Sequence, residues 1–113
     1  MGKDVIVRNT EASIRAMVDR IVRAFSPERI ILFGSHARGT AGPDSDVDLL
    51  VVMPVTGSRR NLATRIELEI SGESIPKDVI VVTPEEVERD RDEVGTVIRP
   101  AMREGRALYE RPV

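Results

Sequence analysis

Apolar residues recur at regular spacings along the first third of the chain, and these spacings predict a helix followed by a strand. Between residues 14 and 25 they recur at three- and four-residue steps, as on the buried face of an amphipathic helix. Asn9 or Thr10 could cap the start of this helix, and Ser26-Pro27 would end it. The continuous apolar run at 29–33 then predicts a short buried strand.

A turn and a second strand are expected next. Gly34-Ser35 interrupts the first strand, and a short helix should begin at about His36. The loop at 41–45 contains glycine, proline, aspartate and serine, which favour turns. It leads to an apolar run at 46–53 that predicts a second, largely buried strand, and residues 54–58 would turn the chain again.

Residues 59–70 carry two conflicting patterns. Ile66, Leu68 and Ile70 alternate with charged residues, which is the period of a strand. We nevertheless predict a helix, because a parallel neighbour for the preceding strand requires a crossover connection. The apolar run at 78–82 then supplies the next strand.

The last third of the chain begins with a helix start signal. Thr83 can cap a helix, Pro84 suits its first position, and Glu86 can complete a capping box. The remaining expected elements are a loop at 71–76, a helix near 96–103 that ends at Gly105, and an edge strand at 106–109. The order of the elements predicts one α/β domain that spans residues 1–113.

Composition narrows the functions that this domain could perform. The 113 residues carry 17 basic and 19 acidic side chains, so the chain exerts no long-range attraction on nucleic acid. Phe25, Phe33 and Tyr109 are too few aromatic residues for a base-stacking surface, and no direct nucleic-acid binding is expected. The lack of cysteine excludes disulfides and thiolate metal sites. No signal region or membrane-length apolar stretch is visible, so a cytoplasmic protein with no membrane contact is expected.

The segment between the first two strands contains the candidate chemistry. Backbone N–H groups at the Gly34-Ser35 turn, between a strand and a helix, would form a cradle for an anion. Asp46 and Asp48 open the next strand two residues apart, so their side chains project from the same face. Two such carboxylates repel each other unless a cation lies between them. Beside a phosphate cradle, magnesium that holds a nucleoside triphosphate is the cation expected.

Two other motifs share part of this spacing, and both fail. Asp44, Asp46 and Asp48 imitate the start of a calcium-binding loop. That loop would need glycine at 49 and glutamate at 55, where the chain has Leu49 and Val55. A phosphate-binding P-loop is also excluded, because the lysine and the following Ser/Thr that it requires are missing.

The motif as a whole resembles that of the nucleotidyltransferase domain of the polymerase-beta superfamily, in its minimal (MNT) form. The resemblance rests on Gly34-Ser35, ten further residues and Asp46-Val47-Asp48. It extends to a third acidic residue on a later strand, Asp78, and to the ending at 101–110, which is similar in many small members. Family members also have a helix at the place of 59–70. The resemblance implies a mixed, twisted sheet flanked by helices.

The resemblance also implies roles for individual residues. Asp46 and Asp48 would bridge two magnesium ions. Asp78 would complete the coordination of the ion nearer the nucleophile and could accept the nucleophile's proton. Gly34-Ser35 would bind the phosphates of ATP. Arg38 is not part of the resemblance, but it lies one turn further along the expected helix and could neutralise phosphate charge.

Several of these residues also have a simpler structural interpretation. Ser35 could cap the helix that follows it, Arg38 could face solvent, and Asp78 could be an ordinary solvated residue at the start of a strand. His36, the sole histidine, cannot build a metal site alone and would line the pocket at most. Tyr109 is expected to pack on the edge strand.

Proteins that this chain resembles act with a partner. The minimal family implies transfer of AMP from ATP to a hydroxyl group of a helical HEPN protein, as the antitoxin of a HEPN/MNT toxin–antitoxin pair. A homo-oligomer is also possible. Two alternatives stay open: a non-catalytic protein that blocks its helical partner by covering it, and transfer to a small molecule such as an aminoglycoside. The acidic segment at 85–93 could attract a cationic drug, although the arginines within it suggest an ordinary solvated helix.

Overall fold

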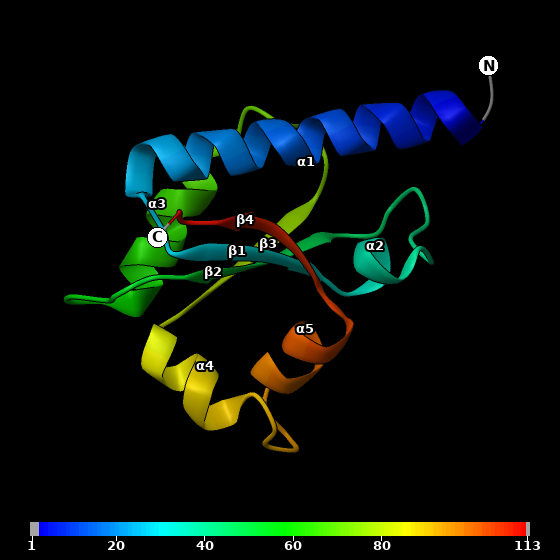
Figure 1. Cartoon of the computed structure of the whole chain (residues 1–113). Coiled ribbons are helices and arrows are strands. Elements are labelled where there is room, and N and C mark those ends of the chain that lie inside the picture. Colours follow the sequence, from blue (N-terminus) through cyan, green and yellow to red (C-terminus); the bar gives the residue numbers. More distant parts are fainter. Residues whose placement is uncertain (1–2, 113) are drawn as a thin grey trace.

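The computed structural model describes the backbone of residues 3–112 and the side chains of residues 10–112. Its helices are α1 (Lys3–Phe25), α2 (Ser35–Arg38), α3 (Arg59–Glu69), α4 (Pro84–Asp90) and α5 (Ile98–Glu104). Its strands are β1 (Arg29–Phe33), β2 (Val47–Val52), β3 (Lys77–Val82) and β4 (Arg106–Glu110). Figure 1 shows the strands as one sheet with helices above and below it.

In the described part of the chain, the strands form one mixed sheet in the order β3-β2-β1-β4. β1 is antiparallel to both β2 and β4, whereas β2 and β3 are parallel. α3 provides the crossover that brings β3 back in the direction of β2, as expected for a parallel neighbour. The fold class predicted from the sequence, an α/β domain with a mixed sheet flanked by helices, is confirmed.

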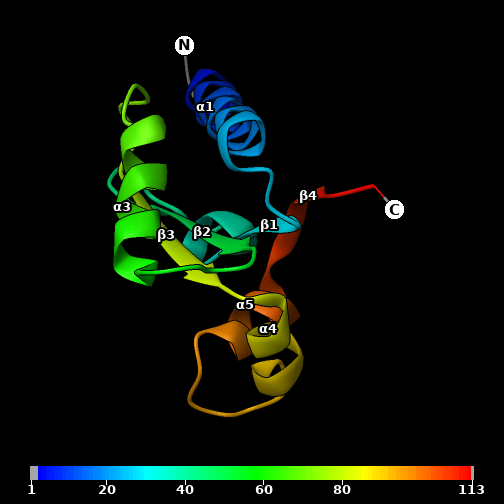
Figure 2. The same ribbon diagram turned by 90° about the vertical axis from the view of Figure 1, so that its left-hand side faces the viewer.

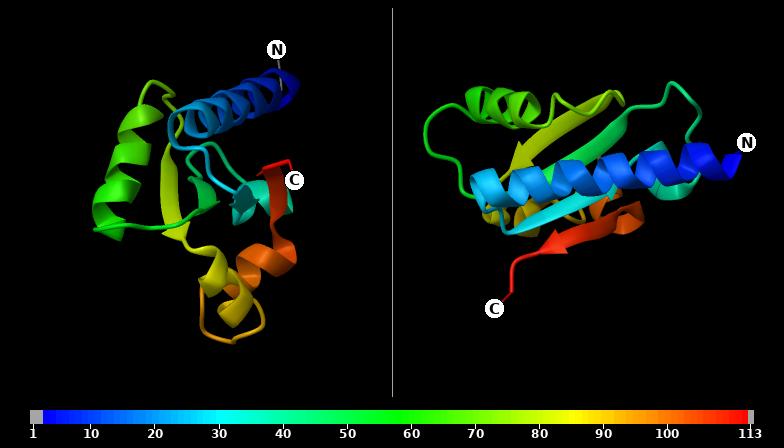
Figure 3. Two further views of the ribbon diagram at one scale, coloured as in Figure 1. Left: turned by 60° about the vertical axis from the view of Figure 1, so that its left-hand side comes forward. Right: turned by 90° about the horizontal axis from the view of Figure 1, so that it is seen from above.

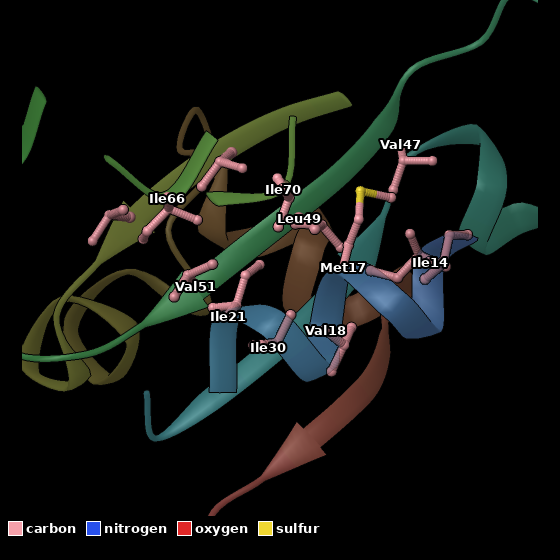
Figure 4. Packing of buried hydrophobic residues seen from close by; sticks show 13 residues of the cluster. Ile14, Met17, Val18, Ile21, Ile30, Val47, Leu49, Val51, Ile66 and Ile70 are labelled. Atoms are coloured by element: carbon pink, nitrogen blue, oxygen red, sulfur yellow. The ribbon is translucent and has the colours of Figure 1, made fainter. Parts of the chain in front are cut away.

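One face of the sheet is covered by α1 and α3 (Figure 2). Met17 and Ile21 of α1 are fully buried there, beside Ile66 of α3. Leu49 and Val51 of β2 lie beneath them and complete this first core (Figure 4). The recurring apolar residues of α1 thus form its buried face, as their spacing predicted.

The opposite face of the sheet is covered by α4 and α5. Val87 of α4 and Ala101 of α5 pack there against Leu50 and Val52 of β2. β2 is therefore buried on both faces, which explains why its sequence is a continuous apolar run instead of an alternating one. The sheet is the middle of three layers.

The conflict of patterns in α3 is resolved in favour of the helix. Ile66 and Ile70 are both fully buried, whereas Leu68 between them is 67% exposed. Residues four apart share a face of a helix, but the residue midway between them points elsewhere. The apparent strand period therefore arose from one exposed leucine.

The start of α1 was predicted incorrectly. The helix begins at Lys3, so Asn9 and Thr10 lie within it and do not cap it. No glycine or proline separates Lys3 from Thr10, and nothing in that segment stops a helix from extending towards the N-terminus. Despite the length of α1, no helix in the described part of the chain has the apolar composition needed to cross a membrane.

The predicted end of α5 at Gly105 is confirmed, but for a different reason. Gly105 has φ −77° and ψ 169°, which is extended backbone and not the left-handed conformation of a usual C-cap glycine. A Cβ atom at this position would lie 2.1 Å from the Ala101 carbonyl oxygen and 2.7 Å from Ile31 Cγ2. Glycine is needed because α5 and β1 leave no room for a side chain.

Candidate active site

The turn after β1 lies directly against the carboxylate motif of β2. The antiparallel pairing of β1 and β2 places Phe33 opposite Asp48, so the next residue, Gly34, is beside the Asp48 side chain. A Cβ atom on Gly34 would lie only 2.3 Å from Asp48 Oδ2. Gly34 also has φ 75° and ψ −157°, a conformation that is open essentially to glycine alone. Glycine is therefore the residue that allows the carboxylate to approach the turn.

A second carboxylate lies beside Asp48 on the neighbouring strand. Asp48 is directly opposite Asp78 in the parallel register of β2 and β3. Their neighbours Leu49 and Val79 belong to the core under α1 and α3, so both carboxylates point to the α4–α5 face of the sheet. Adjacent strands are only about 4.8 Å apart. The structure thus brings together two carboxylates that are far apart in the sequence.

A third carboxylate, that of Asp46, is close enough to Asp48 for its charge to affect the Asp48 pKa. The pKa of Asp48 is raised above its ordinary value, first by partial burial and then by the negative charges of Asp78 and Asp46. The nearby His36 and Arg38 oppose this rise in the Asp48 pKa. Asp46 itself precedes β2 and is exposed, as is Asp78. The three predicted carboxylates therefore form a cluster with an excess of negative charge around Asp48.

The residues predicted to form a phosphate cradle are the short helix α2 and the residue before it. The helix begins at Ser35, one residue earlier than expected, and Gly34 is its N-cap residue. The Ser35 hydroxyl does not cap the helix, so the interpretation of this serine as a cap is wrong. The Ala37 and Arg38 N–H groups donate to the Gly34 carbonyl oxygen. The Ser35 and His36 N–H groups have no acceptor within the helix, so these two are the ones available to an anion.

Arg38 is the last residue of α2, and its side chain extends towards α5. Its Nη1 atom is 3.8 Å from Glu104 Oε2, and the Arg38 side chain is 50% exposed. A half-exposed ion pair of this length is weak, so it leaves the guanidinium available to another anion. Arg38 is close enough to the cluster for its charge to lower the pKa of Asp48.

His36 has a role that the sequence did not suggest. Its Nε2 atom donates a hydrogen bond to the Ser45 carbonyl oxygen at 3.1 Å. The Ser45 hydroxyl oxygen in turn accepts a hydrogen bond of 2.9 Å from the Gly42 backbone N–H. His36 therefore ties the loop between α2 and β2 to the helix, immediately before Asp46. A histidine in the turn was the only sequence signal, and nothing in it pointed to a carbonyl nine residues away.

The donor set fits magnesium, although the side chains do not converge on one point. Three carboxylates provide the oxygen ligands that Mg²⁺ prefers, and their mutual repulsion at Asp48 would be relieved by a cation. Across the residues that the structure describes, however, no group of three or more His, Cys, Asp or Glu side chains is arranged to hold a metal ion. Asp48 with Asp78 is the pair that the sheet itself places side by side.

The comparison with protein families identifies the class to which this fold and cluster belong. The nucleotidyltransferase domain family matches residues 14–108, which include every residue of the predicted site. The chain therefore belongs to the nucleotidyltransferase domain family, as the resemblance of its motif implied. No curated protein matches the sequence of the chain significantly.

Solved structures share the fold at low sequence identity. A protein from Sulfolobus solfataricus described as a nucleotidyltransferase is 22% identical, with a TM-score of 0.60, and the match covers 98% of this chain and 91% of that one. A chain of a toxin–antitoxin complex with AMP-PNP is also 22% identical, with a TM-score of 0.57. A chain of a mutant MntA–HpeT toxin–antitoxin complex is 19% identical, with a TM-score of 0.58. Each of the latter two matches covers 86% of this chain and 73% of the other chain.

Proposed function

We propose that this chain transfers AMP from ATP to a hydroxyl group of a partner protein, as the nucleotidyltransferase of a toxin–antitoxin pair. The main observation behind the proposal is that Gly34 and Asp78 both lie beside Asp48. The glycine turn provides backbone donors for phosphate, and the paired strands place two carboxylates beside that turn. Partial burial and the negative charges of Asp78 and Asp46 raise the pKa of Asp48, so the ionised cluster lowers the stability of the fold, which supports a role in binding a cation.

The carboxylates and the residues of α2 have different roles in the proposed reaction. The Ser35 hydroxyl and the N–H groups at the start of α2 bind the phosphates, and Arg38 neutralises part of their charge. A hydroxyl oxygen of the partner attacks the α-phosphorus and forms a new P–O bond. The bond from the α-phosphorus to the oxygen bridging the α- and β-phosphates breaks, and pyrophosphate leaves. Asp78, which is exposed, accepts the hydroxyl proton and returns it to water.

Asp46, Asp48 and Asp78 are the residues that would hold magnesium, as two ions. The bound ions would neutralise charge on the carboxylates and on the triphosphate. All three carboxylates lie at the end of the sheet where β2 and β3 begin, and the Asp46 and Asp78 side chains are exposed. The site is thus open to a protein acceptor.

A protein acceptor is favoured over a small cationic drug by the ion pairs of the acidic segment. Arg89 forms ion pairs with Asp90 at 2.8 Å and with Glu86 at 3.9 Å. Arg91 pairs with Glu88 at 3.4 Å. The acidic side chains of α4 are thus largely neutralised within the helix and do not form a surface for a polycation. Two of the structural neighbours are chains of toxin–antitoxin complexes, one with AMP-PNP, and this supports a protein partner and an adenine nucleotide.

Labelled ATP tests the proposed reaction directly. The chain, magnesium and a helical partner protein of the HEPN type would be incubated with ATP labelled either at the α-phosphate or at the γ-phosphate. Label from the α-phosphate should appear on the partner, and label from the γ-phosphate should not. Transfer from the γ-phosphate alone would show a kinase, and tight binding to the partner without transfer from either label would favour the non-catalytic alternative.

A further inference from the structure

A groove of about 830 Å³ runs between α1 and the edge strand β4. Figure 3, in its view from above, shows α1 lying over β1 and running beside β4. None of the residues proposed to bind ATP or magnesium lines this groove, so it is separate from the candidate active site. Its apolar surface includes the half-buried side chains of Val22, Leu108 and Tyr109.

The α1 wall of the groove carries charges of alternating sign. Glu11, Arg15, Asp19 and Arg23 follow each other at four-residue steps, and all four are exposed. Such steps place them along one ridge of the helix. Among the described residues none of the four forms an ion pair, and Arg23 donates only to the Asp19 backbone carbonyl, at 3.4 Å. The ridge is therefore a row of charges without ion-pair partners in the described part of the chain, in the order negative, positive, negative and positive.

This alternation restricts what can bind. A polyanion or a polycation would be repelled at every second position of the ridge. A complementary surface must instead present alternating charges with the same spacing and the opposite order. The α1 helix of this chain has that property when its direction is reversed, because the row reads from negative to positive in one direction and from positive to negative in the other.

We infer that the groove is the interface of a homodimer, in which two α1 helices pack antiparallel about a two-fold axis. Glu11 then faces Arg23 of the partner subunit, and Arg15 faces Asp19 of the partner subunit. The two-fold axis repeats both contacts, so every charge of the ridge finds an opposite charge. The interface is independent of the reaction at the carboxylate cluster.

The packing geometry of helices is consistent with this arrangement. Rows of residues at four-residue steps lie side by side when two helices cross at about 50°, which is the commonest packing class. From Glu11 to Arg23 the ridge extends about 18 Å along the helix, at 1.5 Å per residue. The half-buried apolar side chains of the floor would contribute to the affinity, and the charges at its rim would set the antiparallel register.

Paired charge reversals test the inference. The variant with Arg15→Glu and Arg23→Glu has an acidic ridge, and the variant with Glu11→Arg and Asp19→Arg has a basic ridge. We expect the wild-type chain to sediment as a dimer and each variant alone to dissociate at least about a hundredfold more readily, because like charges then face each other. An equimolar mixture of the two variants should form a dimer again. All four side chains are exposed, so the fold should tolerate the changes, and circular dichroism would verify that it does.

A matched control separates the ridge from the overall charge. Arg60→Glu with Arg91→Glu changes the net charge of the chain as the acidic-ridge variant does, but on α3 and at the end of α4. This control should remain a dimer. A wild-type chain that stays monomeric at its highest soluble concentration would overturn the inference. Two charge-reversed variants that both remain dimeric, or whose mixture remains monomeric, would overturn it as well.

Discussion

At the scale of single residues, the approach of Gly34 to Asp48 determines the geometry of the candidate site. Any side chain at 34 would push against the Asp48 carboxylate, because its Cβ atom would lie 2.3 Å from Oδ2. Gly39, at the other end of α2, has a similar φ of 76°, but a Cβ atom there would meet no other atom within 4 Å. The two glycines therefore separate the effect of a positive φ from the effect of the close approach.

Gly34→Ala should destabilise the protein more than Gly39→Ala. The left-handed conformation alone costs about 1 kcal/mol at Gly39. At Gly34 the clash with Asp48 and the ψ of −157° add to that cost, and we expect a further loss of about 2 kcal/mol. Urea unfolding of the two variants and the wild type measures the difference. Equal losses of unfolding free energy in the two variants would show that the Asp48 carboxylate moves aside without an energetic cost.

Asp48→Asn should stabilise the protein without ligands while removing its activity. The folded-state pKa of Asp48 is raised by burial and by Asp78 and Asp46, so the folded chain binds a proton that the unfolded chain has already lost. Stability therefore falls as the pH rises above about 4, the range in which an unfolded aspartate ionises. Asparagine lacks this titration. The free energy of unfolding of Asp48→Asn, measured from pH 3 to pH 8, should exceed that of the wild type only in the upper part of the range. A variant less stable at pH 8 would contradict the electrostatic account.

The hydrogen bond from His36 to Ser45 should position Asp46. His36→Ala removes the donor, and loss of a bond worth about 1 kcal/mol should lower the rate of nucleotide transfer about fivefold. His36→Gln offers an N–H group at a similar place and should restore most of the rate. Hydrogen exchange of the Gly42 and Ser45 amides, measured without any substrate, should rise in the alanine variant only. Unchanged exchange and unchanged transfer in His36→Ala would contradict this role.

At the scale of elements, Glu86 links the starts of two helices. It completes the capping box of α4 by accepting a hydrogen bond from the Thr83 N–H at 2.8 Å. The same oxygen lies 2.9 Å from Nη1 of Arg59, the first residue of α3. The Arg59 hydrogen bond is the main cause that lowers the pKa of Glu86 below its ordinary value. The sequence predicted the capping box but not the second partner.

Glu86→Gln should therefore cost stability in a pH-dependent way. Because the folded-state pKa of Glu86 is lowered, its contribution is present above about pH 4 and is lost as the pH falls through the folded-state value. The variant should be less stable than the wild type at neutral pH and equally stable in acid. Thr83→Ala is the control, because the Thr83 side chain is the smallest cause of the lowered Glu86 pKa, and loss of this cap should cost about 1 kcal/mol with little dependence on pH. Chemical denaturation at both pH values checks the two variants, and a pH-independent loss in Glu86→Gln would exclude the ion pair as its cause.

Local signals in the sequence were sufficient to predict most elements. The apolar runs identified β1, β2 and β3, although β2 is one residue shorter at each end than expected and β3 begins one residue earlier, at Lys77. The capping box identified α4. The start of α1 could not be predicted, because Asn9 and Thr10 are good capping residues that happen to lie inside a longer helix. The end of an element is decided between several possible capping and helix-forming residues, and the sequence alone does not show which of them ends the helix.

The candidate site was predicted as a set of residues but not as a geometry. Spacing along one strand predicted that Asp46 and Asp48 act together, and the structure places Asp48 near both Asp46 and Asp78. The pairing of Asp48 with Asp78 depends on the register of β2 and β3, which no local pattern determines. The steric need for Gly34 and the loop contact of His36 also depend on neighbours distant in the sequence. Such contacts require the folded chain.

At the scale of the whole molecule, the candidate active site and the proposed dimer groove lie at different parts of the sheet. Its end near α2 carries the carboxylate cluster, where ATP and an acceptor hydroxyl could meet. Its β4 edge carries the groove with the charged ridge of α1. Because none of the proposed ligand-binding residues lines that groove, a dimer through α1 would leave both carboxylate clusters open to a partner protein.

The mass of the partner protein tests the central claim most directly. The partner would be incubated with ATP, magnesium and either the wild-type chain or the double variant Asp46→Asn, Asp48→Asn, and then analysed by intact-mass spectrometry. We expect the wild type to add the mass of one AMP to the partner and the double variant to add nothing, while both still bind the partner. A partner modified equally by the double variant, or never modified by the wild type, would contradict the assignment of these carboxylates to nucleotide transfer.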